Sequence, residues 1–308
     1  MYIEEAYKGK TNFWRYLIPI VLFFGLMALN MIVMQFLDLD FEKLIKEEIA
    51  AKGSNRVFLE NLIPFVIFLG ALLFWVKTVH KQPIKALTTS RKKMDWGRVF
   101  FAFGLGAIFL SASILIDYYI SPEDYLWNFN LDKFLILAAI TVLLIPLQIG
   151  FEEYFFRGYL MQGFGVLAGN RWVPLIVTSV VFGGLHYFNP EVSKMGDIVM
   201  ISYIGMGFVF GILTLMDEGL ELALGLHAAN NMIVALLVTA DWTAFQTESV
   251  FKDISEPTAG WGEILIPLLI FYPILLFIMA KKYGWSDWKN KLFGKVQKPE
   301  TIKLSEES

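Results

Sequence analysis

The chain has 308 residues, of which 56% are hydrophobic and 18% are charged, and its formal net charge is −3. That charged fraction lies below the roughly 25% of average soluble domains, and no basic patch suggests a nucleic-acid partner. The chain contains no cysteine, which excludes disulfides, thiolate catalysis and cysteine-rich metal sites. The composition therefore indicates an integral membrane protein.

Apolar runs long enough to cross a bilayer, which takes about 20 residues, recur along the chain. The first run is longer than the apolar part of a signal peptide and no cleavage site follows it, so we expect it to be retained. In chain order the runs are Phe13–Leu37, Val57–Val76, Val99–Ile120, Phe134–Phe151, Val173–Phe188, Ile198–Met216, Leu220–Val238 and Ile264–Ala280. We predict an all-α polytopic membrane protein with about eight transmembrane helices.

Lys and Arg are shared unequally between the two sides that eight spans create. The termini and the second, fourth and sixth connections hold 19 of them, whereas the other four connections hold 7. Cytoplasmic segments are enriched in Lys and Arg, so we expect both termini in the cytoplasm and the protein in the plasma membrane. The basic second connection, which contains His80, is expected to be a solvated loop near anionic lipid headgroups.

No internal repeat or low-complexity linker divides the chain, so residues 1–308 are predicted to form one membrane domain with a motif core at about 134–238. After the last span, Trp285, Trp288, Leu292 and Val296 share one helical face. This pattern predicts an interfacial amphipathic helix over residues 283–298. The polar residues 299–308 are predicted to be a disordered tail.

The fourth span ends in Glu152-Glu153-Tyr-Phe-Phe-Arg157. Ionisable groups within spans cost about 2.5–3.5 kcal/mol each on insertion scales, which makes them functional candidates. Glu153 and Arg157 are four residues apart and can pair on one helical face, whereas Glu152 points about 100° away. One carboxylate can thus be neutralised while the other stays reactive. The alternative to a functional role is that the two carboxylates are a polar stop signal at the membrane interface.

Two of the three histidines also lie within apolar runs. His186 follows Phe182-Gly-Gly, where the missing side chains let a neighbouring helix or a substrate approach. His227 and Asn231 are four apart, and both can donate hydrogen bonds to a developing oxyanion. Each of these residues alone could equally serve as polar contact between helices.

These three motifs, E-E-x-x-x-R, F-x-x-x-H and H-x-x-x-N in that order on successive spans, resemble the CAAX-protease and bacteriocin-processing (Abi) family of intramembrane endopeptidases. The prenyl-protein type II CAAX peptidases belong to this family. The resemblance implies that Glu152 activates a water with help from His186, and that His227 and Asn231 stabilise the oxyanion. It also implies that Glu153 and Arg157 support the site and that Phe182 packs against it.

The resemblance favours a glutamate mechanism without a cofactor over a metal-dependent endopeptidase. If zinc were bound, Glu152, His186 and His227 would be its ligands, but the H-E-x-x-H helix of zinc proteases is absent. The expected partners are membrane lipid and a membrane-associated, possibly lipidated or prenylated peptide, cut near the cytoplasmic face. The rival functions are a proton-coupled transporter and a non-catalytic immunity or scaffold protein with the same fold.

Overall fold

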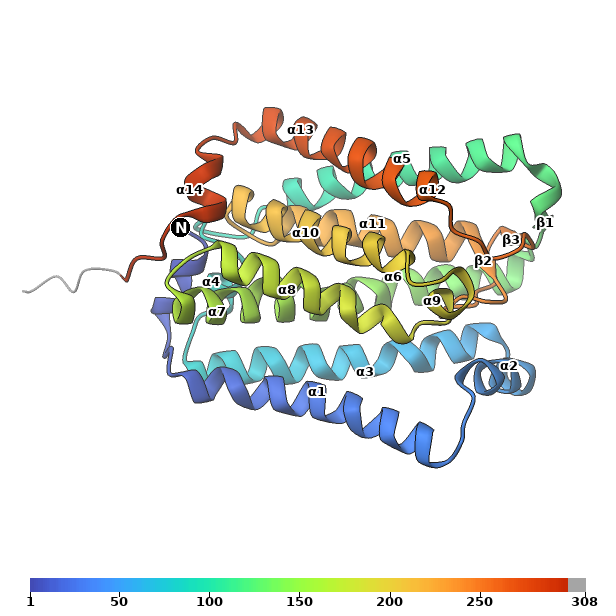
Figure 1. The fold of residues 1–308 in the computed structure, drawn as a ribbon, viewed down its shortest axis with the longest axis horizontal. Coiled ribbons are helices and arrows are strands. Elements are labelled where there is room, and N and C mark those ends of the chain that lie inside the picture. Colours follow the sequence, from blue (N-terminus) through green and yellow to red (C-terminus); the bar gives the residue numbers. More distant parts are fainter. Residues whose placement is uncertain (299–308) are drawn as a thin grey trace, which may run out of the picture.

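The computed structural model describes residues 1–298, and its helices run back and forth along one axis in eight passes (Figure 1). The passes are α1 (Phe13–Phe36); α3 (Ser54–Trp75) with η2 (Val76–His80); α5 (Trp96–Ile120); α6 (Leu131–Glu153) with η4 (Tyr154–Leu160) and α7 (Met161–Ala168); α8 (Trp172–Gly184); α10 (Val199–Asp217); α11 (Glu221–Leu237); and α12 (Trp261–Ile266) with η6 (Pro267–Phe271) and α13 (Tyr272–Tyr283). Six passes are long and apolar enough to cross a membrane, while α8 and α11 belong to shorter apolar helices. The predicted all-α polytopic membrane fold is confirmed.

Short elements connect the passes. They are η1 (Ile3–Lys8), α2 (Phe41–Lys52), α4 (Ile84–Thr88), η3 (Pro122–Asp124), β1 (Tyr125–Trp127), η5 (Leu185–Phe188), α9 (Pro190–Met195), β2 (Val238–Ala240), β3 (Phe251–Asp253) and α14 (Trp288–Phe293). The strands form one small sheet in the order β1-β3-β2, in which β1 pairs antiparallel and β2 parallel to β3. This sheet joins two connections that are far apart in sequence.

Hydrogen bonds gather the connections into two opposite ends. At the first end, the Tyr2 hydroxyl donates to the Leu87 carbonyl (2.6 Å) and Lys291 Nζ donates to the Met216 carbonyl (2.8 Å). We call this the termini end; it comprises residues 1–12, 81–95, 169–171, 218–220 and 284–298 (Figure 1). The other end, the sheet end, comprises residues 37–53, 121–130, 189–198 and 238–260. These two groups are the ones that an eight-span sequence predicts.

Salt bridges fix the helices at the termini end. Arg91 contacts Asp217 Oδ2 at 2.8 Å and Glu221 Oε2 at 3.1 Å, and Arg98 also pairs with Asp217. Both carboxylates are buried at the start or end of a pass. The basic second connection is therefore tied to α10 and α11 rather than being only a solvated loop.

The expectation that His80 is solvated is wrong. Only 1% of its surface is exposed, and its Nδ1 and Nε2 lie 2.8 Å from the Lys10 carbonyl and 3.1 Å from the Tyr159 hydroxyl. The chain after α3 continues as the π-helical η2 and turns inward beneath the N-terminal segment. Local composition does not report that packing, because the residues that cover His80 come from distant parts of the sequence.

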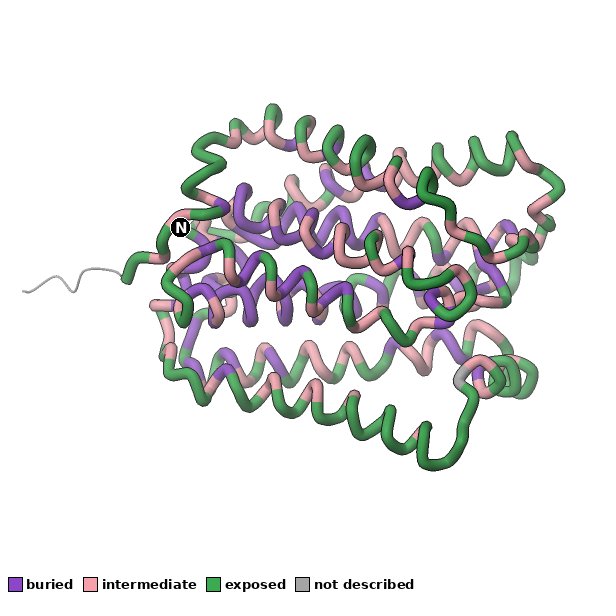
Figure 2. Tube along the Cα trace, in the orientation of Figure 1, coloured by how far each residue is buried: buried purple, intermediate pink, exposed green. Residues whose placement is uncertain are grey.

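Burial is concentrated in α6, η4, α8, α10 and α11, whereas the outer helices expose apolar side chains along most of their length (Figure 2). This is the pattern of a membrane protein whose outer face meets lipid and whose inner helices pack on one another. The inner helices carry the motif residues, so the candidate site lies in the packed centre.

The fourth pass differs most from expectation. The hydropathy pattern predicts that this span ends at Phe151, but α6 continues through η4 and α7 to Ala168. Glu152 therefore lies inside a continuous helical pass and not at its end, which removes the interpretation of the carboxylates as a stop signal. The drop in hydropathy reflects buried ionisable groups that find partners on other helices.

The C-terminal helix is shorter than the predicted range 283–298. Only α14, Trp288–Phe293, is helical, and Leu292 and Val296 pack in a cluster with Ile3 and Met161 of the protein itself. The apolar face thus covers the termini end of the bundle, where the sequence suggested contact with lipid. The predicted disordered tail, 299–308, lies outside the described residues.

Close approach between α5 and α11 depends on two glycines. A Cβ at Gly225 would lie 2.1 Å from the Val99 carbonyl oxygen, and one at Gly106 would lie 2.9 Å from the Ala229 Cβ. Glycine is thus required where the two helices touch, as in other membrane helix pairs. The contact sets the position of α11, which carries His227 and Asn231.

We expect Gly225→Ala to destabilise the protein by about 1–3 kcal/mol, because an added methyl group forces α5 and α11 apart. Thermal unfolding of the detergent-solubilised protein measures this as a lower melting temperature. Gly104→Ala on α5 is the matched control, since a Cβ there meets nothing within 4 Å. Equal melting temperatures for the two variants would contradict the packing argument.

Candidate active site

Three helical segments bring the predicted site residues together. Glu152 and Glu153 end α6, His186 lies in η5, and His227 and Asn231 lie on α11. His227 sits between the two carboxylates: its Nδ1 is 2.8 Å from Glu153 Oε1 and its Nε2 is 3.5 Å from Glu152 Oε2. The adjacent glutamates thus face opposite sides of one imidazole ring.

Glu153 and Arg157 form the pair that their spacing predicts. Arg157 Nη1 donates to Glu153 Oε1 at 3.0 Å, Arg157 Nη2 donates to the Gly207 carbonyl at 3.2 Å, and both side chains are fully buried. The guanidinium also lies over the Phe182 ring, 4.1 Å from its centroid. Glu153 therefore has a structural role: it accepts from Arg157 and from His227, and it joins α6 to α11.

Phe182 packs against the site as expected. Its ring centroid lies 5.0 Å from that of His186 and 5.9 Å from that of His227. The aromatic ring thus separates the two histidines and contacts the guanidinium of Arg157 from the same position. It excludes water from the structural side of the site.

His186 is oriented by its own helix. Its Nδ1 lies 2.9 Å from the Phe182 carbonyl oxygen, and its ring stacks on Tyr203 of α10 with centroids 4.3 Å apart. A carbonyl accepts only, so Nδ1 carries the proton and Nε2 of the neutral ring is left as an acceptor. Gly183 permits this approach of α8 to α10, because a Cβ there would lie 2.6 Å from the Ile204 nitrogen.

Gln148 is a site residue that the sequence interpretation missed. Its Nε2 donates to Glu152 Oε1 at 2.8 Å, and its Oε1 accepts from Asn231 Nδ2 at 3.3 Å. Asn230 Nδ2 in turn donates to Asn231 Oδ1 at 3.1 Å. The available signal was a polar side chain one helical turn before Glu152 within an apolar run. Glu152 is thus held by Gln148 at one oxygen and faces His227 at the other.

A cavity of about 1110 Å³, counted with the open space at its mouth, extends from these residues to the sheet end. Glu152, His186, His227 and Asn231 form its floor, and its outer wall includes residues 238–240, residues 242–245 and Asn189. A second cavity of about 980 Å³ shares Gln148, Glu152 and His186 with it and is bounded by α1 and α3. The catalytic candidates are therefore open towards the sheet end.

Towards the termini end the site is closed. Phe155, Phe156, Tyr159 and Leu160 of η4 are each at most 3% exposed and pack in the main hydrophobic cluster. Two sequence-based expectations are therefore incompatible in this fold: the site cannot open near the cytoplasmic face if both termini are cytoplasmic.

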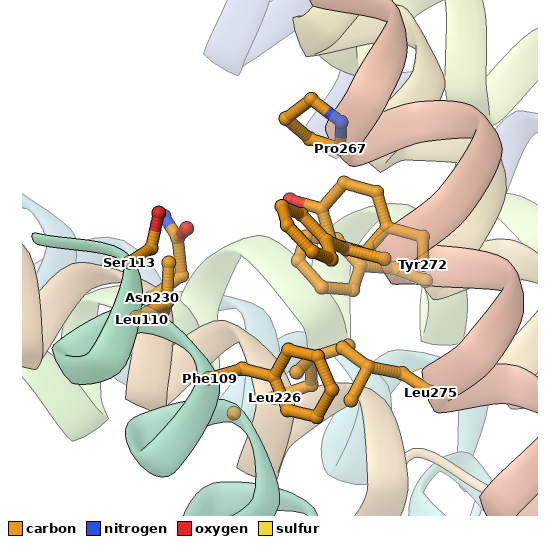
Figure 3. Close-up of a pocket in the computed structure, with 11 residues that line it drawn as sticks. Phe109, Leu110, Ser113, Leu226, Asn230, Pro267, Tyr272 and Leu275 are labelled. Carbon is orange, nitrogen blue, oxygen red and sulfur yellow. The ribbon is translucent and has the colours of Figure 1, made fainter. Parts of the chain in front are cut away.

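An apolar pocket of about 580 Å³, counted with the open space at its mouth, lies beside α11 (Figure 3). Side chains of α5, α10, α11, η6 and α13 line it, among them Phe109, Leu226, Tyr272 and Leu275. Its polar side chains include Ser113 and Asn230, and Asn230 also lines the site cavity. The pocket is thus an apolar space beside the polar floor, of a kind that suits a lipid chain or large apolar side chains.

The donors considered for zinc do not gather as ligands would. Within residues 1–298, no group of three or more His, Asp or Glu side chains converges on a point that could hold a metal ion. His227 Nε2 lies 3.5 Å from Glu152 Oε2, whereas His186 has Nδ1 bonded to the Phe182 carbonyl and Nε2 free, an orientation that a metal-bound histidine also adopts. Among the described residues, the donors therefore do not converge as the ligands of a tetrahedral zinc site do.

The mouth of the cavity presents further polar groups. Glu191 Oε1 accepts from the Ala244 nitrogen at 2.9 Å, and burial raises the pKa of this carboxyl. Glu191 Oε2 and Trp242 Nε1 are buried and have no hydrogen-bond partner among the described residues. An extended peptide carries both N–H and C=O groups and could satisfy this acceptor and this donor.

We expect Arg157→Met to destabilise the protein by about 3–5 kcal/mol, because it leaves the buried Glu153 without its cation. The matched control is Arg56→Met, which removes a pair with Glu60 of the same i,i+4 spacing in which the Arg side chain is 69% exposed. That loss should be at most about 1 kcal/mol. Thermal unfolding in detergent compares the two variants, and similar losses would argue against a buried structural pair.

Comparisons with known proteins identify the family of the chain. The family model described as type II CAAX prenyl endopeptidase Rce1-like matches residues 132–233, a range that contains Gln148, Glu152, His186, His227 and Asn231. The chain is 34% identical over 240 residues to the uncharacterized protein YyaK of Bacillus subtilis (strain 168), covering 75% of this chain and 80% of YyaK. No solved structure matches the chain. The protein therefore belongs to the Rce1-like family of type II CAAX prenyl endopeptidases.

Proposed function

We propose that the protein is an intramembrane endopeptidase that hydrolyses a peptide bond of a membrane-associated substrate with a water activated by Glu152. The observation that carries this proposal is the position of the Glu152 carboxylate, fixed between Gln148 and His227 on the floor of an open cavity. A carboxylate held at both oxygens and open to water is placed to act as a general base.

The reaction would proceed in two steps. Glu152 takes a proton from water while the resulting hydroxide attacks the substrate carbonyl carbon, which gives a tetrahedral intermediate with a negative oxygen. The C–N bond then breaks, and the proton on Glu152 passes to the leaving amine. His186 supports the first step, because its free Nε2 can accept a hydrogen bond from the same water.

The oxyanion would be stabilised from α11. Asn231 uses one amide N–H for Gln148, which leaves the second for a substrate oxygen. With a proton on each ring nitrogen, His227 remains bonded to Glu153 through Nδ1 and offers Nε2–H to the developing charge. Preorganised donors of this kind in a site shielded from water provide a large part of the rate enhancement of acyl-transfer enzymes.

The substrate is proposed to be membrane-associated because the cavities are bounded by helices that face lipid. The second cavity lies against α1 and α3, and the apolar pocket of Figure 3 lies beside Asn230. A peptide with a lipid chain or a strongly apolar segment could place that part there while its backbone reaches Glu152. Prenylation is one such modification, and the apolar lining suits other chains equally well.

The transporter alternative requires a path between the two ends. Instead, the fully buried aromatic side chains of η4 separate the cavity from the termini end. A non-catalytic scaffold would need no carboxylate oriented by two hydrogen-bonding neighbours. Both rivals therefore fit the site less well than a hydrolase does, and Glu152 distinguishes them experimentally.

Glu152→Gln is expected to lower peptide cleavage by about 10²–10⁴-fold, because the amide keeps the shape but cannot accept the proton of water. The assay uses purified protein in detergent with a quenched fluorescent peptide library that includes farnesylated and palmitoylated members. Glu248→Gln is the control, since this carboxylate pairs with Lys133 at the sheet end. Cleavage by the Glu152→Gln variant at the wild-type rate would contradict the glutamate mechanism.

A strong zinc chelator tests the remaining mechanistic choice in the same assay. Unchanged activity after chelation is expected for a water activated by Glu152 and His186. Loss of activity that added zinc restores would establish a metal-dependent endopeptidase instead.

Gln148→Leu is expected to lower kcat by about 10²-fold with little change in KM, since it frees the Glu152 carboxylate without altering the cavity walls. Steady-state kinetics with the best library peptide measures both constants. A parallel melting curve must show a folded protein. A rise in KM at constant kcat would assign Gln148 to substrate binding and not to the orientation of Glu152.

A further inference from the structure

We propose that the active site is reached from the extracytoplasmic side of the membrane, so that its substrate is a peptide exposed on that side. This inference rests on the proposed endopeptidase function and specifies where its substrate must be. It follows from two independent features, the direction in which the cavity opens and the charges of the two ends of the bundle.

The cavity opens at the sheet end. Its outer wall is formed by β2, by the segment that follows β2, and by Asn189 and Glu191 before and within α9. Tyr203, which also lines the cavity, is four residues from the start of α10 at that end, a rise of about 6 Å. The other end of α10, Asp217, lies a further 14 residues away, about 21 Å, at the termini end. The mouth of the cavity is thus at the sheet end, and its floor lies deeper: His227 is ten residues, about 15 Å, from the sheet-end limit of α11.

The opposite route is blocked by protein. Below the floor of the cavity, the fully buried side chains of η4 fill the space towards the termini end. The Arg91 and Arg98 salt bridges then close the ends of α10 and α11. Water and a polar peptide backbone therefore reach Glu152 from the sheet end.

The charges of the two ends are opposite. The sheet end, residues 37–53, 121–130, 189–198 and 238–260, contains 5 Lys and Arg against 13 Asp and Glu. The termini end, residues 1–12, 81–95, 169–171, 218–220 and 284–298, contains 12 Lys and Arg against 5 Asp and Glu. Lys and Arg are retained on the cytoplasmic side during membrane insertion. The termini end is therefore cytoplasmic, and the cavity faces outwards.

The tertiary structure strengthens this assignment. Arg157, counted with the fourth connection from sequence alone, is buried in the site and does not contribute to either end. The excess of Lys and Arg over Asp and Glu at the termini end persists without Arg157. Hydrogen bonds also fix which connections share an end, so the count no longer depends on estimated span limits.

The substrate class changes accordingly. A protein that is lipidated and remains on the cytoplasmic face would not present its backbone to this cavity. A peptide that has been exported, or the outer segment of a membrane-anchored protein, would reach it directly. The acidic surface around the mouth favours the approach of peptides that carry Lys or Arg near the cleaved bond.

Single introduced cysteines test the proposal, because the chain has no cysteine of its own. Ala244→Cys marks the cavity wall, Glu256→Cys marks the exposed sheet end, and Lys93→Cys marks the exposed termini end. Intact cells are treated with a charged maleimide that cannot cross membranes, and labelling is read as a mass shift of the purified protein. We expect the first two variants to be labelled in intact cells and Lys93→Cys only after permeabilisation.

Labelling of Lys93→Cys but not of Glu256→Cys in intact cells would overturn the proposal, since the cavity would then face the cytoplasm. Labelling of Glu256→Cys with protection of Ala244→Cys would also overturn it, because the outer end would be exposed without access to the site. If Ala244→Cys fails to fold, Trp242→Cys replaces it in the same wall. None of these readouts requires proteolysis, so a failure here is distinct from a failure of the Glu152→Gln assay.

The side from which a substrate reaches the site is then measured in vesicles. The wild-type protein is reconstituted into vesicles, its orientation is determined by protease protection of the C-terminal tail, and the quenched peptide is supplied only outside. Cleavage is expected in vesicles whose sheet end faces outwards and is lost when the termini end does. The reverse dependence would refute an extracytoplasmic site.

Discussion

The buried contacts of Glu153 with Arg157 and His227 hold the centre of this protein together. A carboxylate and a guanidinium without exposure are costly in a membrane unless each finds a partner. Here Arg157 also donates to the Gly207 carbonyl of α10, and His227 brings in α11. Three helices are thereby fixed by one polar cluster. The orientation of Glu152 then follows, because its neighbour Glu153 cannot rotate away.

This cluster separates two kinds of chemistry on adjacent residues. Glu153 is fully buried and faces a cation, so it stabilises the fold. Glu152 borders a cavity, contacts Gln148 and His227, and remains available to water. Two adjacent glutamates on a helix differ by about 100° in direction, which is enough to place one in the core and the other at the surface of a cavity.

In the proposed function, the parts of the chain that carry out the reaction differ from those that line the space for the substrate. Every proposed catalytic residue falls within the range matched by the family model, 132–233. Much of the cavity walls lies outside it: α1 and α3 bound the second cavity, the β2–β3 connection forms the mouth, and η6 and α13 line the apolar pocket. One fold can therefore combine a reaction that the family shares with a substrate that is specific to this protein. The walls also decide from which side of the membrane the peptide comes.

The sequence by itself determined the membrane class, the eight passes, the grouping of their connections and most of the residues that meet in the candidate site. These properties depend on local hydropathy and on i,i+4 spacing, as with Glu153 and Arg157, which short stretches of sequence encode. Only the tertiary structure decided the placement of Gln148, the burial of His80, the continuation of the fourth pass to Ala168 and the direction of the cavity. Each of these depends on side chains from distant helices that replace water as partners, and no local pattern contains that information. An ionisable group that lowers hydropathy thus has the same sequence signature at a membrane surface and in a buried polar cluster.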